Sequence, residues 1–133
     1  MRLDDGRVMT EFITAALACR PLRLDAGGEQ TRSFCYVADM VTGLVALMGH
    51  PSQLGLVNLG GDEEIKLNDL ARQIITLVGS ASQIEWAPRR PDDPMQRKPD
   101  TSLATNALGW RPQVTLTTGL AALIHSARNT FAP

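Results

Sequence analysis

The sequence lacks the glycine-rich turn, of the G-x-G-x-x-G or G-x-x-G-x-x-G type, that normally opens a dinucleotide-binding α/β domain. It also lacks an excess of charge, because 13 lysines and arginines stand against 14 aspartates and glutamates. Nucleic-acid-binding domains usually show a basic excess gathered on one face. The composition therefore favours neither a dinucleotide site nor a nucleic-acid partner.

Long apolar runs are missing as well, and none approaches the roughly 20 residues that a membrane span requires. The first ten residues show no positive region followed by an apolar stretch, so no secretory signal is visible and a cytoplasmic location is expected. A length of 133 residues predicts one domain, covering residues 1–133.

Cysteine and histidine are too sparse to suggest a metal site. Cys19 and Cys35 do not form a C-x-x-C pattern, and we expect two buried thiols. His50 and His125 are far apart in the sequence, so neither begins a metal-ligand cluster. No metal is predicted.

The spacing of apolar residues predicts helices at five places, namely residues 8–17, 37–48, 67–78, 102–108 and 116–127. Asn68 is a candidate cap for the third helix, and Gly79 and Gly109 fit the left-handed residue that ends a helix. Short strands are predicted at residues 22–25, 33–37, 56–59 and 83–87. This alternation of helices and strands predicts an α/β fold.

Two segments combine arginine with irregular backbone. Residues 27–33 contain a Gly-Gly turn followed by Arg32. Residues 88–100 contain four prolines, which predicts an irregular, extended loop, and they include Arg97. Either segment could hold a phosphate, because the planar guanidinium donates two parallel hydrogen bonds to phosphate oxygens. The alternative is that Arg32 and Arg97 pair with nearby carboxylates such as Asp93 and Asp100 on a solvated surface.

Several runs resemble one family in matching order along nearly the whole chain. They are D-D-G-R-V at residues 4–8, G-E-Q-T-R-S-F-C-Y-V at 28–37, V-N-L-G at 57–60, D-D-P-M-Q-R-K-P-D at 92–100 and L-G-W-R-P at 108–112. Together they resemble the NAD-dependent epimerase/dehydratase family of extended short-chain dehydrogenases, and within it the UDP-glucuronate decarboxylases. The resemblance implies the carboxy-terminal, substrate-binding portion of that fold, without the main Rossmann half.

In that family the missing half binds NAD and carries a Tyr-x-x-x-Lys pair that transfers protons. Here Tyr36 is the only tyrosine, and Met40 stands four positions later, where a lysine would be needed. The resemblance therefore implies that the chain has no catalytic residues, binds no NAD and is not catalytic alone.

The resemblance also implies four substrate-binding residues. Arg32 and Arg97 would reach the phosphates of a UDP-sugar, Gln30 would line the same pocket, and Asp93 would lie near the ribose. A departure from the family is Asp25, where the family usually has an aromatic residue before the Gly-rich turn. A carboxylate there would repel a phosphate and weakens the case for nucleotide binding.

Two functions follow as alternatives. The chain is either a truncated sugar-nucleotide decarboxylase or epimerase relative that binds a UDP-sugar at most, or a stand-alone scaffold domain that binds no nucleotide. Because a missing half would leave apolar surface uncovered, we expect a homo-oligomer. A separate chain that supplies the Rossmann half is a third option.

Overall fold

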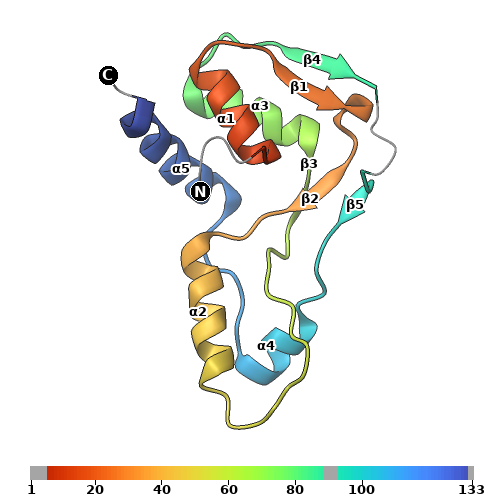
Figure 1. The fold of residues 1–133 in the computed structure, drawn as a ribbon, viewed down its shortest axis with the longest axis vertical. Coiled ribbons are helices and arrows are strands. Elements are labelled where there is room, and N and C mark those ends of the chain that lie inside the picture. The colour runs from red at the N-terminus through yellow and green to blue at the C-terminus, as the bar shows by residue number, and fades with distance from the viewer. Residues whose placement is uncertain (1–5, 89–92, 132–133) are drawn as a thin grey trace. The chain divides into compact units, whose positions relative to one another are not determined.

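The computed structural model describes residues 6–88 and 93–131. Its backbone divides into two compact units, one built from residues 1–31, 65–95 and 120–133, the other from residues 32–64 and 96–119. We call them unit 1 and unit 2 and describe each by itself. Within the described residues the elements alternate between helix and strand, which confirms the predicted α/β class (Figure 1).

Unit 1 is built on a pair of parallel strands, β1 (Leu22–Asp25) and β4 (Ile84–Ala87), in which Leu22 lies opposite Ile84. Helices α1 (Val8–Leu17) and α3 (Leu67–Val78) pack beside this pair and against each other (Figure 1). The last part of α5 (Leu116–Phe131) also belongs to unit 1. The fully or almost fully buried side chains come from α1, β1, α3 and α5 and form one core: Phe12, Ile13, Leu22, Leu24, Leu70, Ile74, Leu120 and Ile124.

Unit 2 contains helices α2 (Val37–Met48) and α4 (Ser102–Leu108), which pack on each other. Trp110 is 6% exposed and lies against α2, where its indole nitrogen donates to the backbone oxygen of Asp39 at 2.9 Å. Gly43 permits this approach, since a Cβ there would come within 2.8 Å of the Trp110 ring. Trp110 is therefore a packing residue whose polar atom finds a partner.

The structure contains a strand, β5 (Gln96–Arg97), where the sequence predicted an irregular loop. It pairs with β2 (Thr31–Ser33), which pairs in turn with β3 (Glu64–Lys66), so the sheet order is β3-β2-β5. The proline-rich segment 88–100 is therefore not irregular throughout. Its residues 89–92 lie outside the described structure. The prolines flank the strand without occupying it, so its N–H groups stay available for pairing.

Two predicted strands were wrong. The strand at residues 33–37 lies earlier, in β2, because the polar residues Thr31 and Arg32 pair with neighbouring strands and Phe34 to Tyr36 do not. Residues 56–59 form no strand, and Leu56 is 99% exposed. An apolar run becomes a strand only where another strand lies alongside it, and the described residues offer it none.

The predicted helix caps were right at one end and wrong at the other. Gly79 and Gly109 adopt the left-handed conformation, with φ of 69° and 63°, and end α3 and α4 as expected. Asn68, however, lies inside α3, where its side-chain oxygen accepts from Arg72 Nε at 3.2 Å. Lys66 occupies the N-cap position and gives no side-chain cap.

The two cysteines differ from the expectation of buried thiols. Cys19 is exposed, because it follows the end of α1 in a left-handed conformation with φ of 50°. Cys35 is half-buried, and burial together with the charges of Asp39 and Asp62 raises the pKa of its thiol. Neither thiol belongs to a cluster of metal ligands among the residues that the structure describes.

Candidate functional site

The four residues predicted to bind substrate fall into two pairs. Gln30 and Asp93 lie in unit 1, while Arg32 and Arg97 lie in unit 2. Each pair has its own local geometry, which we describe separately.

Gln30 is fully buried, although it is a polar residue. Its side-chain nitrogen donates to Asp93 Oδ2 at 2.8 Å, and its backbone oxygen accepts from the Leu67 amide at 2.9 Å. The side-chain oxygen Oε1 is buried and has no hydrogen-bond partner among the described residues. A buried acceptor without a donor costs about 1–3 kcal/mol, so this amide is a place where a donor from a ligand or a water would stabilise the chain.

Arg32 and Arg97 lie on neighbouring strands that run in the same direction (Figure 1). The Thr31 amide donates to the Met95 oxygen at 2.8 Å. In a parallel pair this bond sets Thr31 opposite Gln96, and therefore Arg32 opposite Arg97 on the same face. Neighbouring strands are about 5 Å apart, so the two side chains leave the sheet close together. Arg97 is exposed and Arg32 is half-buried.

This register has an electrostatic consequence. Two like charges directly opposite each other on one face destabilise a sheet. A polyvalent anion placed between the two guanidinium groups would be attracted to both, since each group can donate two parallel hydrogen bonds.

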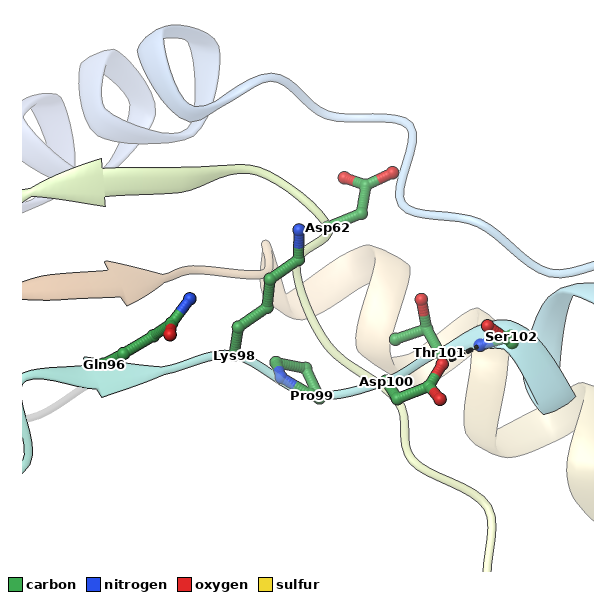
Figure 2. Close-up of a pocket in the computed structure, with 7 residues that line it drawn as sticks. All are labelled: Asp62, Gln96, Lys98, Pro99, Asp100, Thr101 and Ser102. Atoms are coloured by element: carbon green, nitrogen blue, oxygen red, sulfur yellow. Dashed lines mark hydrogen bonds between the residues drawn. The ribbon is translucent and has the colours of Figure 1, made fainter.

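A pocket of about 620 Å³ lies on the other side of β5, within unit 2 (Figure 2). Gln96 and Lys98 line it, whereas Arg97, which alternates with them along the chain, does not. Figure 2 shows the Lys98 side chain extending toward the segment that carries Asp62. The remaining lining residues are Pro99, Asp100, Thr101 and Ser102.

The carboxylate of Asp100 shapes the rim of this pocket. It accepts a hydrogen bond from the Ser102 amide at 2.9 Å, and the bonds from Ser102 lower the pKa of Asp100 below its ordinary value. Its backbone oxygen accepts from Asn58 Nδ2 at 3.2 Å, so Asn58 satisfies a backbone acceptor. Six of its seven lining residues lie between positions 96 and 102, at the end of the proline-rich segment that the sequence singled out, and only Asp62 comes from a distant part of the sequence.

The described residues do not fit a dinucleotide. A dinucleotide is held where a strand passes through a glycine-rich turn into the N-terminus of a helix. Strand β1 leads instead through the short 3₁₀ turn η1 (Ala26–Gly28) into β2, and the next element described after β4 is the strand β5. Strand β3 does run directly into α3, but no glycine lies between Glu64 and Leu67. We therefore derive no chemistry through NAD in this chain.

No helix among the described residues has both the length and the apolar character needed to span a bilayer.

Comparison with known proteins gives the class first: the chain has the α/β fold of enzymes whose names describe action on UDP-sugars. UDP-glucose 4-epimerase from Thermotoga maritima, solved with UDP-glucose, matches with a TM-score of 0.89 and 25% identity over 95% of this chain and 40% of that one. UDP-glucuronic acid 4-epimerase from Bacillus cereus, solved with UDP-glucuronic acid and NAD, matches with a TM-score of 0.88 and 26% identity over 95% of this chain and 41% of that one.

The family follows from the sequence. Residues 2–60 match the NAD dependent epimerase/dehydratase family. UDP-glucuronic acid decarboxylase 3 of Arabidopsis thaliana is 45% identical over 120 residues, which are 90% of this chain and 35% of that protein. The chain is thus a relative of this family, and it spans about a third of the length of the curated relatives it matches. The predicted resemblance is confirmed.

Proposed function

We propose that this chain is a nucleotide-sugar-binding portion of an epimerase/dehydratase-type enzyme, and that Arg32 and Arg97 bind the diphosphate of a UDP-sugar. The observation that carries the proposal is their position opposite each other on β2 and β5. A diphosphate supplies the negative charge that two adjacent guanidinium groups favour. The names of the relatives support the choice of a UDP-sugar.

Gln30 and Asp93 complete the proposed set of substrate-binding residues. The unsatisfied Oε1 of Gln30 supports a role toward a hydrogen-bond donor, and a uracil or a sugar hydroxyl offers one. Asp93 fixes the orientation of the Gln30 amide, because its carboxylate accepts from the amide nitrogen. The Gln30 amide is therefore held so that Oε1 is left to accept a hydrogen bond from a ligand.

The chain on its own is proposed to bind and not to catalyse. Tyr36 has no lysine four positions later, and the described residues do not fit NAD. Catalysis would then require the portion of the family's length that this chain does not span, supplied from elsewhere.

The proposal is tested by titrating the purified chain with UDP and UDP-glucuronate in a calorimeter. Two charge-assisted contacts with phosphate predict a Kd of about 1 mM, and replacing both arginines in an Arg32→Ala, Arg97→Ala variant should weaken binding at least tenfold. Arg23→Ala is the matched control, since Arg23 is an exposed arginine on β1 in unit 1. An equal loss in the control variant would mean that binding is unspecific.

A scaffold function without nucleotide binding is the second candidate, and it is favoured by the apolar side chains that α2 exposes, of which Met48 is 86% exposed. No heat with UDP at about ten times the expected Kd would leave this candidate as the better one.

A further inference from the structure

Strand β5 carries Arg97 at the edge of the β3-β2-β5 sheet, and with two residues it is the shortest of the described strands (Figure 1). An edge strand pairs on one side only, and a strand this short gains few backbone bonds. The Arg97 side chain forms no hydrogen bond or ion pair within the part of the chain that the structure describes. The direction in which its guanidinium leaves the sheet therefore depends on the position of the β5 backbone.

A side chain of β5 reaches a strand that is not its neighbour. The Gln96 side-chain nitrogen donates to both carboxylate oxygens of Glu64, at 2.9 and 3.0 Å. Glu64 lies on β3, at the other side of the sheet, so this contact passes over β2, and both partners belong to unit 2. Hydrogen bonds to an ionised acceptor are stronger than neutral ones. The contact thus ties β5 to β3 across the strand that carries Arg32.

This contact also determines the face on which Arg97 lies. Successive side chains of a strand point to opposite faces, so Arg97 leaves the sheet on the face opposite the Gln96–Glu64 contact. A slip of β5 by one residue would exchange the faces of Gln96 and Arg97. A bond that keeps Gln96 on the face of Glu64 therefore keeps Arg97 on the other face.

We propose that Glu64 is a positioning residue for the nucleotide site, because its bond to Gln96 holds β5 in the register that sets Arg97 opposite Arg32. The inference rests on the proposed function, and it adds a residue that acts on the diphosphate only through Arg97. Glu64 does not touch the ligand, since its carboxylate bonds to Gln96 on the opposite face of the sheet.

The charge of Glu64 makes the expected result different from a simple electrostatic effect. A carboxylate near a phosphate repels it, so on charge alone the removal of Glu64 would strengthen the binding of UDP. If Glu64 positions Arg97, its removal weakens that binding. The two explanations therefore predict changes of opposite sign in the Kd for UDP.

The test is a titration of the full chain with UDP, followed by NMR, for the unmodified chain and three variants. Glu64→Ala should weaken binding about threefold, a loss in the range of exposed charged contacts. Glu64→Gln keeps an oxygen that accepts from Gln96 and lacks the charge, so it should bind UDP at least as tightly as the unmodified chain. The matched control is Glu63→Ala, because Glu63 is exposed and forms no hydrogen bond or ion pair among the described residues. This control should bind UDP at least as tightly as the unmodified chain.

Hydrogen exchange of the Thr31 amide measures the position of β5 without any ligand. This amide donates to the oxygen of Met95, the residue directly before β5. In Glu64→Ala it should exchange about threefold faster than in the unmodified chain, because the strand would separate from β2 more often. In Glu64→Gln and Glu63→Ala its exchange rate should stay unchanged.

Unchanged or tighter UDP binding by Glu64→Ala would overturn the proposal. So would an equal loss in Glu64→Gln or in Glu63→Ala, since the bond to Gln96 would then not be the cause. The two measurements also separate this inference from the proposed function. UDP binding by the unmodified chain, with Thr31 exchange unchanged in Glu64→Ala, would refute this inference alone. Faster Thr31 exchange in Glu64→Ala, with no UDP binding by the unmodified chain, would refute the nucleotide site alone.

Discussion

The buried carboxylate of Asp39 is predicted to be the strongest single polar contribution to the stability of unit 2. Asp39 is 6% exposed, and its Oδ2 accepts from the amides of Gln113 and Val114 at 3.0 and 2.9 Å. These bonds hold the segment after Trp110 against the first turn of α2. Replacing Asp39 by alanine leaves both amides without an acceptor. At roughly 1.5 kcal/mol for each bond to a charged group, the variant should lose about 3 kcal/mol.

Helix α3 offers a matched control in the same chain. Asp69 occupies the same third position of its helix as Asp39 does in α2, but it is exposed. Asp69→Ala removes an attraction to the exposed Lys66 and the interaction with the helix dipole, of which the latter contributes about 0.3–1 kcal/mol. The comparison therefore separates the two buried hydrogen bonds from the effect of a negative charge near a helix N-terminus.

Urea unfolding followed by tryptophan fluorescence measures the effect. Trp110 lies with Asp39 in unit 2, and Trp86 lies with Asp69 in unit 1, so each variant is followed by the tryptophan of its own unit in a background where the other tryptophan is phenylalanine. We expect the midpoint to fall for Asp39→Ala by at least three times the fall for Asp69→Ala at an unchanged slope. Equal losses in the two variants, or a loss below 1 kcal/mol for Asp39→Ala, would refute the reasoning.

Three further predictions concern unit 2. Gly61→Ala should prevent stable folding of the unit, because its Cβ would overlap the backbone carbonyl of Phe34; an unfolding midpoint equal to that of the unmodified chain would contradict this. Asp100 should titrate below its ordinary pKa in an NMR experiment, and Ser102→Ala should raise that pKa toward normal. Because folding lowers the pKa of Asp100, this carboxylate stabilises the folded chain at pH values above its unfolded pKa, and the stabilisation is lost as the pH falls through its folded pKa. An unchanged Asp100 pKa in Ser102→Ala would refute the assignment. Iodoacetamide should modify the two cysteines in two phases, with Cys35 slower because its pKa is raised, and a single phase would refute this.

Most helices could be predicted from the sequence because their apolar residues recur at helical spacing. The predicted start and end of α2, α3 and α4 agree with the structure, and Gly79 and Gly109 mark two of the ends through their left-handed conformation. The caps at the helix starts could not be predicted in this way. Asn68 is a good N-cap residue by type, but Leu67 already begins α3, so Asn68 falls one residue too late to serve.

Strands were harder to predict than helices, since pairing with a distant segment decides whether a strand forms. The polar residues of β2 and β3 show no strand pattern, yet each lies beside another strand in the sheet. The same limit applies to the candidate site. Resemblance to the family selected Arg32 and Arg97, but only the register between β2 and β5 sets one opposite the other.

Residues 56–59 and the exposed apolar side chains of α2 show the converse of this limit. Their sequence has the composition of a buried strand and a core-facing helix, and it was interpreted in that way, yet Leu56 and Met48 are among the most exposed apolar side chains described. The spacing of apolar residues indicates the surroundings in which a segment is stable, whether or not the described residues provide those surroundings. The conflict between pattern and exposure is therefore informative. It indicates that α2 and residues 56–59 have the pattern of a more extensive α/β layer than the described residues form.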